Sequence, residues 1–308
     1  MGYDVIGDIH GQAAKLEALL AQLGYSEGPD GWVPPAGRQA VFLGDLIDRG
    51  PEQLKVIRIV RGMVDAGHAR CVMGNHEFNA IGYVTPRRDG SGRFLRHHSP
   101  DKIEQHAEFL AQVGEGSELH HELIDWFKSL PPALDLGGIR VVHAWWHQPH
   151  FDLVEKSFWD GESMSEDFLH AAHDKKSPVW AAMDGLLKGL EIDLPDGHQY
   201  HDHAGVPRKN VRTAWWRPGV SKYREAAIVP SGQIDLLPDH PLPAGYLGAA
   251  PQGAPVFVGH YWFCGQPAVE SGKLACLDWA AAKAGPLVAY RWDGESELSS
   301  DRLVAAWA

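Results

Sequence analysis

The strongest constraint on the fold is a run of strand–loop–helix units at the start of the chain. Apolar runs at residues 3–7, 40–43 and 69–73 are too short for helices and are typical of buried strands. Apolar residues at helical spacing follow the first two runs, and a polar loop follows each of the three. The carboxyl ends of strands in an open α/β sheet meet in one crevice. We therefore expect the three loops to share one site.

These loops carry three polar motifs in order along the chain. The motifs are Asp8-Ile9-His10-Gly11, Gly44-Asp45-Leu46-Ile47-Asp48-Arg49-Gly50 and Gly74-Asn75-His76-Glu77. Further strands predicted at 139–142 and 256–258 end in His143 and His260. Polar residues that merely end a strand would explain one such motif, but three in order favour a common function.

The converging side chains suit divalent metals. Carboxylate, imidazole and amide-oxygen donors bind manganese, iron or zinc. Asp45 has two carboxylate oxygens and can bridge two ions. We expect Asp8, His10 and Asp45 on one ion, and Asp45, Asn75, His143 and His260 on the other. Two such ions clamp a phosphate ester and lower the pKa of a bound water, so that metal-bound hydroxide attacks without a protein nucleophile.

Such a reaction still needs a proton donor and groups that hold the substrate. His76 follows the ligand candidate Asn75 and can face the substrate as a general acid, with Asp48 orienting it. The alternative for Asp48 is a helix N-cap. Arg49 offers a planar fork for phosphate oxygens, with a structural ion pair as its alternative. The remaining substrate-binding candidates, beside Asn75 and Arg49, are Arg212 and Arg217, which otherwise lie on the surface.

The pattern predicts one domain over 1–308 with two additions. Residues 78–130 form a helical excursion, with helices at 102–113 and 118–129. Residues from about 147 to 255 form a partly helical cap insertion, with helices at 162–174 and 179–190. Strands at 256–258, 273–277 and 287–292 then resume the core. A histidine-rich stretch at 198–203 would either bind another metal or be a solvated loop.

Composition restricts the partners. The chain has 28 basic and 40 acidic residues, a net charge of −12, which argues against a nucleic-acid duplex or a membrane surface as partner. Bound cations can reverse the local sign, so an anionic substrate remains open. The chain has no long apolar run, and its first strand begins near residue 3 with no leader before it, so we expect a cytoplasmic protein.

At the quoted motifs the chain resembles the calcineurin-like metallophosphoesterases, most closely the phosphoprotein phosphatases and bacterial relatives of diadenosine tetraphosphatase. The resemblance implies a four-layer α/β/β/α sandwich, a binuclear metal centre and the roles given above. Three positions depart from the family pattern. Trp262 replaces a frequent second histidine, Met73 replaces the arginine usual in phosphoprotein phosphatases, and Ala144-Trp145 replaces Gly-Gly after His143. The last two differences argue against a specificity restricted to phosphoproteins.

The expected function is a metal-dependent phosphoric ester hydrolase. Phosphate monoesters come first, either a phosphoprotein or a small phosphomonoester. Hydrolysis of a dinucleoside polyphosphate is the alternative. A scaffold with an inactive phosphatase fold is the non-enzyme alternative, but such a protein would be expected to lack a ligand or His76, and both are present.

Overall fold

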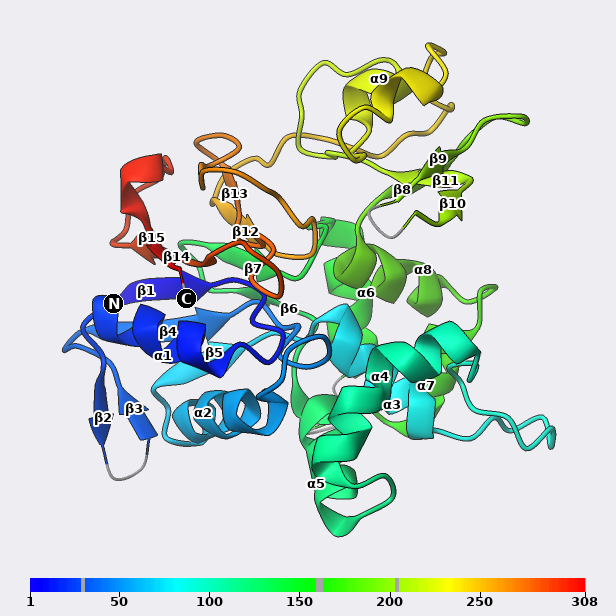
Figure 1. The fold of residues 1–308 in the computed structure, drawn as a ribbon. Coiled ribbons are helices and arrows are strands. Elements are labelled where there is room, and N and C mark those ends of the chain that lie inside the picture. Colours follow the sequence, from blue (N-terminus) through cyan, green and yellow to red (C-terminus); the bar gives the residue numbers. More distant parts are fainter. Residues whose placement is uncertain (29–30, 159–162, 203–204, 308) are drawn as a thin grey trace.

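The computed structural model describes residues 1–28, 31–158, 163–202 and 205–307 (Figure 1). Its larger sheet has the strand order β15-β14-β1-β4-β5. The strands are β1 (Gly2–Ile6), β4 (Arg38–Phe42), β5 (Ala69–Cys71), β14 (Leu287–Trp292) and β15 (Leu303–Ala306). β1, β4 and β5 are parallel, whereas β14 and β15 run antiparallel to their neighbours. The three motif-bearing strands are therefore adjacent and point the same way.

A second sheet brings in the two later histidines. Its order is β13-β12-β7-β6. The strands are β6 (Ala133–Asp135), β7 (Arg140–Val142), β12 (Val256–Val258) and β13 (Leu274–Cys276). β12 is parallel to both β7 and β13, and β6 is antiparallel to β7. His143 and His260 consequently leave neighbouring strands at the same edge.

The two sheets pack face to face. Val5 and Val41 of the larger sheet and Val141 and Phe257 of the smaller one are fully buried in a common apolar cluster. The Phe257 ring lies 5.1 Å from that of Tyr290 on β14. Alternating side chains on these strands therefore bury one sheet face against the other.

Helices cover the outer faces. α1 (Ala13–Gln22) and α2 (Gln53–Asp65) contact the larger sheet. α6 (Gln148–Phe158) and α8 (Pro178–Lys188) pack together beside the smaller sheet, where Ala144 N donates to Leu186 O. These layers form the α/β/β/α sandwich and confirm the predicted fold class.

The remaining elements lie in the excursion, the insertion and small hairpins. They are α3 (Asn75–Val84), α4 (Pro100–Val113), α5 (Glu118–Ser129), α7 (Glu166–His173), α9 (Tyr223–Ala226), β2 (Ser26–Gly28), β3 (Gly31–Val33), β8 (Glu191–Asp193), β9 (Tyr200–His201), β10 (Pro207–Arg208), β11 (Asn210–Arg212) and the 3-10 turns Ile234–Leu236 and Ser300–Arg302. The helices predicted at 102–113, 118–129, 162–174 and 179–190 correspond to α4, α5, α7 and α8, whereas α6 was not predicted.

The histidine-rich stretch at 198–203 lies only partly within the described residues, because His203 is outside them. Among the described residues, the groups able to hold a metal include neither His198 nor His201. In this stretch Asp202 instead pairs with Arg208, at 2.7 Å. A further metal at this stretch has no support in the described residues.

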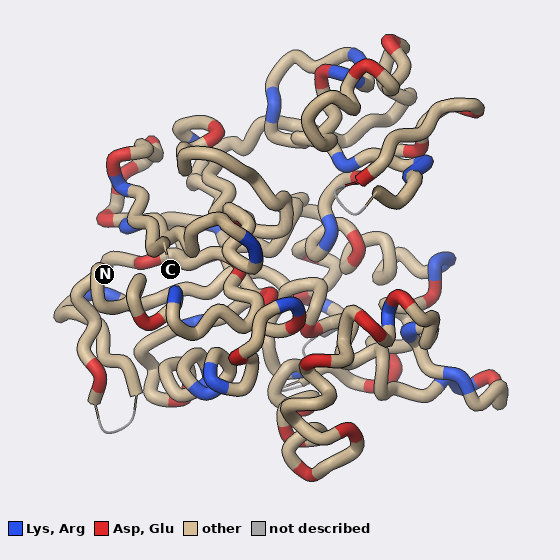
Figure 2. Tube along the Cα trace, in the orientation of Figure 1, with Lys and Arg blue, Asp and Glu red and all other residues tan. Residues whose placement is uncertain are grey.

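Acidic and basic residues are mixed along most elements (Figure 2). No helix within the described segments combines the length and the apolar composition needed to cross a bilayer.

Candidate functional site

The strand ends bring the predicted metal ligands together. Asp8 and His10 follow β1, Asp45 follows β4, Asn75 follows β5, and the two later histidines follow β7 and β12. A cavity of about 720 Å³ is lined by Asp8, His10, Asp45, Asn75, His76 and His260. His143 is fully buried beneath it. Every predicted ligand thus lies at this cavity or directly below it.

Asp45 is at the centre of the cluster. Its Oδ2 lies 3.4 Å from His143 Nε2, 3.5 Å from His10 Nε2 and 3.8 Å from His76 Nε2. Its Oδ1 accepts a hydrogen bond from His76 N at 3.0 Å. Two groups could each hold a cation, namely His10-Asp45-His76 and Asp8-Asp45-His143. Asp45 belongs to both, as expected of a bridging residue, although this structure groups Asp8 with His143.

Backbone carbonyls fix the two histidine rings nearest Asp45. His10 Nδ1 donates to Ile47 O at 2.8 Å, and His143 Nδ1 donates to Leu43 O at 2.7 Å. Each ring therefore turns Nε2 toward Asp45, the orientation that a metal-binding imidazole needs.

Asn75 joins the two later histidines. Its Oδ1 lies 2.8 Å from His260 Nδ1 and 3.2 Å from His143 Nε2. Asp8 Oδ2 accepts from His260 N at 2.9 Å. Within the described part of the chain, Asp8 Oδ1 and His260 Nε2 are buried without a hydrogen-bond partner. Unpaired buried polar atoms are costly, so the donor set fits a divalent cation.

Burial and crowding shift the pKa values of the cluster in both directions. Burial would raise the pKa of Asp45, but the neighbouring His143 and His76 lower it well below its usual value. Burial and the nearby Asp278 raise the pKa of Asp8. Burial would lower the pKa of His143, but Asp45 and Asp8 raise it to about 10. The carboxylates thus retain a proton on His143. A bound cation would replace that proton and neutralise the same carboxylates.

Backbone geometry at the site is unusual. His10, Asp45, Asp48, Arg49 and His260 all have positive φ, between 46° and 72°. This conformation is uncommon outside glycine and clusters at functional sites. Gly259 also has a specific role, because a Cβ there would clash with the Asp8 carboxylate.

Glu77 holds two motif loops together, a role that the sequence did not suggest. Its fully buried carboxylate accepts from Gly74 N and Asp45 N at 2.9 Å, and from Leu46 N at 2.8 Å. The sequence signal that could have indicated this role is the position of Glu77 at the end of the third motif. Glu77 therefore fixes the loop that presents Asp45 to the candidate metal site.

His76 and Asp48 form the predicted pair. His76 Nδ1 lies 2.5 Å from Asp48 Oδ2, and both side chains are about 2% exposed. Burial would raise the pKa of Asp48, but hydrogen bonds from His106 and His76 keep it below its usual value. Asp48 therefore remains a carboxylate that orients the His76 ring.

The predicted arginines lie in different places. Arg49 and Arg212 line the cavity, the latter paired with Glu191 at 3.3 Å. Arg217 is not a lining residue and donates to Glu225 O at 2.9 Å. The Arg49 guanidinium lies 4.3 Å from the centre of the Trp262 ring, and Lys283 Nζ lies 4.6 Å from the same centre. Lys283 was not predicted.

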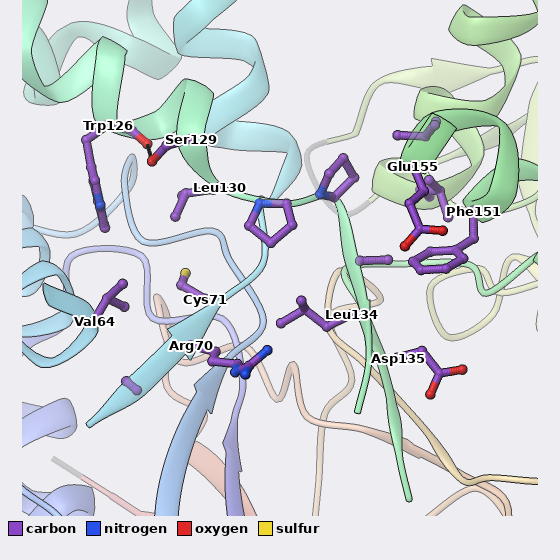
Figure 3. A pocket seen from close by; sticks show the side chains of 16 residues that line it. Val64, Arg70, Cys71, Trp126, Ser129, Leu130, Leu134, Asp135, Phe151 and Glu155 are labelled. Atoms are coloured by element: carbon purple, nitrogen blue, oxygen red, sulfur yellow. Dashed lines mark hydrogen bonds between the residues drawn. The ribbon is translucent and has the colours of Figure 1, made fainter. Parts of the chain in front are cut away.

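A second cavity (Figure 3) has a volume of about 460 Å³ and shares no lining residue with the first. It is lined mainly by apolar side chains, among them Trp126, Leu134 and Phe151. Its charged lining residues are Arg70, Asp135 and Glu155. It has no histidine in its lining, so the candidate metal ligands belong to the larger cavity.

Comparisons with known proteins agree with this geometry. A family model described as calcineurin-like phosphoesterase matches residues 1–220. The asymmetrical bis(5'-nucleosyl)-tetraphosphatase PrpE of Bacillus subtilis is 47% identical over 76 residues, covering 25% of this chain and 31% of that protein. The symmetrical bis(5'-nucleosyl)-tetraphosphatase of Methylococcus capsulatus is 26% identical over 306 residues, covering 96% of this chain and 94% of that protein.

The chain spans 31% to 55% of the length of the first three curated relatives that it matches. Among solved structures, a protein serine/threonine phosphatase from Saccharomyces cerevisiae aligns with a TM-score of 0.47 at 15% identity. The alignment covers 99% of this chain and 78% of that one.

Proposed function

The chain belongs to the calcineurin-like phosphoesterase family, and from this premise we propose that it is a phosphate ester hydrolase that uses two divalent metal ions. The observation that carries the proposal is the convergence on Asp45 of three imidazole nitrogens, all within 3.8 Å of one carboxylate oxygen. The proposed ligands are Asp8, His10, Asp45, Asn75, His143 and His260. Manganese is the first candidate, with iron or zinc as alternatives.

When bound, two divalent ions neutralise charge on the phosphate oxygens and lower the pKa of a nearby water. The chain's own residues would hold the substrate at the cavity wall. Arg49 lines the cavity and presents its guanidinium to phosphate oxygens. We propose Arg212 as a further contact, because it lines the same cavity from the insertion. Arg217 remains a sequence-based prediction.

His76 is the proposed proton donor. Its Nδ1 is hydrogen-bonded to Asp48, so Nε2 is the nitrogen that can serve a substrate. As water attacks phosphorus and the bond to the leaving oxygen breaks, Nε2 gives its proton to that oxygen. General acid catalysis of this kind contributes about a hundred- to ten-thousandfold.

The insertion at 147–255 is proposed as a cap within a single 1–308 domain. Tyr200, Arg208, Asn210 and Arg212 from this insertion line the cavity together with the strand-end residues. The helical excursion at 78–130 supplies Glu104 and Glu108 to another part of the wall. Both additions would therefore influence which substrates enter.

A phosphate monoester, from a phosphoprotein or a small molecule, is the first proposed substrate class. The test compares a phosphopeptide, a small alkyl phosphate and diadenosine tetraphosphate as substrates of the purified protein with manganese. We expect manganese-dependent release of phosphate from the monoesters. No hydrolysis of any of the three would refute the phosphoesterase proposal, whereas turnover of the tetraphosphate alone would refute the monoester assignment.

Hydrolysis of a dinucleoside polyphosphate is the second candidate. Arg49 and Lys283 are both placed over Trp262, and neither has an acidic partner within 4 Å among the described residues. The turn that carries Lys283 is anchored, because buried Lys15 donates to Ala281 O at 2.9 Å and Gly285 O at 2.8 Å. Two cations in one cavity favour a substrate with more than one phosphoryl group. The names of the bacterial relatives favour the same class.

The variant Lys283→Met tests this second candidate. Removing one charged phosphate contact costs about 1.5 kcal/mol or more, roughly a tenfold change. We expect the KM for diadenosine tetraphosphate to rise by about tenfold, while the KM for an alkyl phosphate changes little. Lys273→Met is the matched control, since Lys273 pairs with Glu297 and does not line the cavity. Equal effects of Lys283→Met on both substrates would contradict a subsite for a second phosphoryl group.

A further inference from the structure

A buried histidine from the helical excursion contacts the proposed acid pair. His106 on α4 is 3% exposed, and its Nδ1 lies 2.8 Å from Asp48 Oδ1. The other carboxylate oxygen of Asp48 faces His76 Nδ1 at 2.5 Å. One carboxylate thus joins two histidines from segments that are 30 residues apart in sequence. Asp48 accepts a separate hydrogen bond from each ring.

Asp48 is the polar partner of His106. The His106 ring otherwise packs on aromatic rings, 4.9 Å from Phe109 and 5.2 Å from Tyr83 between centroids. Its Nε2 is buried without a hydrogen-bond partner among the described residues. The ring is therefore oriented by one hydrogen bond and by packing.

Asp48 needs external support to keep its orientation. Its backbone has φ of +63°, which is uncommon for a residue with a side chain, and its N–H donates to Gln53 Oε1 at 2.8 Å. If His106 were absent, Oδ1 would lose its side-chain donor in a buried place. The carboxylate could then rotate, and the His76 ring would lose its fixed direction.

We propose that His106 is a positioning residue for the proton donor, holding Asp48 so that His76 Nε2 faces the leaving oxygen. This inference rests on the proposed function. His106 does not line the cavity, although its neighbours Glu104, Gln105 and Glu108 do. It therefore acts through Asp48 and does not touch substrate. The helical excursion accordingly contributes to catalysis as well as to the cavity wall.

Two near-isosteric variants separate this role from simple packing. The side-chain amide nitrogen of asparagine can occupy the place of His106 Nδ1, so His106→Asn keeps the donor to Asp48. Glutamine places its amide nearer the Nε2 position, so His106→Gln keeps a polar side chain of similar size but not that hydrogen bond. A packing role predicts no advantage for asparagine.

The measurement is kcat on two monoesters with manganese, an alkyl phosphate and 4-nitrophenyl phosphate. An alkyl alkoxide leaves poorly and needs a proton, whereas nitrophenolate leaves with little help. We expect His106→Gln and His106→Ala to lower kcat on the alkyl phosphate by about ten- to a hundredfold, with KM little changed. The loss of kcat on 4-nitrophenyl phosphate should be smaller. The variant His106→Asn should keep most of the wild-type kcat on the alkyl phosphate.

Equal losses on both substrates, or His106→Asn no better than His106→Gln, would overturn the inference. His120→Gln is the control for losing another buried histidine of the excursion, because His120 is 2% exposed and does not contact Asp48. It should leave the ratio of the two rates unchanged. If His106→Ala does not fold, the asparagine–glutamine comparison decides. A wild-type protein that hydrolyses neither ester would refute the monoester assignment itself, which is a different result.

Discussion

Replacing His76 by asparagine is expected to slow hydrolysis of an alkyl phosphate by about a hundredfold or more, while the bound metal remains. The reason is that His76 Nε2 is the proposed source of the proton for the leaving oxygen. The loss should be much smaller for 4-nitrophenyl phosphate, whose leaving group needs no proton. Steady-state rates on both esters, with metal content measured on the same samples, check this prediction.

Two outcomes would contradict the assignment of His76. Unchanged rates would remove it from the mechanism. Loss of a metal ion would make it a ligand, which is a real alternative because His76, His10 and Asp45 lie close enough to hold a cation. Metal content therefore distinguishes a proton donor from a ligand.

Replacing Asp45 by asparagine is expected to have the largest effect of all. Its carboxylate faces three imidazoles and belongs to both candidate cation groups, so its loss should weaken both metal sites. We expect hydrolysis of every phosphate ester to fall on the order of a thousandfold. Metal analysis should show less bound manganese per chain.

The matched control is Asp65→Asn. Asp65 is an exposed carboxylate at the end of α2, paired with Arg61 at 3.7 Å. It should leave both activity and metal content unchanged. An Asp45→Asn protein with full activity would show that the Asp45 carboxylate does not bridge two metal ions needed for hydrolysis.

The sequence allowed much of the site to be predicted because its residues follow parallel strands. Short apolar runs with polar ends indicate such strands directly, and β12 spans the residues predicted for it. Once the strand order is known, Asp8, Asp45 and Asn75 must lie at one edge. These positions depend on local pattern and on a general rule of α/β sheets.

Other features depend on contacts between distant residues and leave little local signal. His106 reads as a polar interruption of an apolar helix face, and its meaning comes only from Asp48, far away in sequence. α6 was missed because Pro149 and polar residues obscure its period, and packing against α8 stabilises it. β6 and β15 are short edge strands that become visible only through their pairing with β7 and β14.

Two departures from the family pattern can now be placed. Met73 is fully buried and does not line the cavity, so it supplies no charge where phosphoprotein phosphatases were expected to have arginine. Trp262 lines the cavity and lies under two cations, Arg49 and Lys283. The positive charge over Trp262 therefore comes from Arg49, which belongs to the second motif, and from Lys283, which no motif predicted.

The most direct test of a two-metal phosphoesterase is the manganese content of the purified wild-type protein, measured together with its hydrolysis of an alkyl phosphate and diadenosine tetraphosphate. We expect about two ions per chain at saturation and loss of hydrolysis when a chelator removes them. Hydrolysis should recover when manganese is restored. A protein that binds no manganese, iron or zinc and hydrolyses neither substrate would refute a two-metal phosphoesterase and favour a scaffold with an inactive fold.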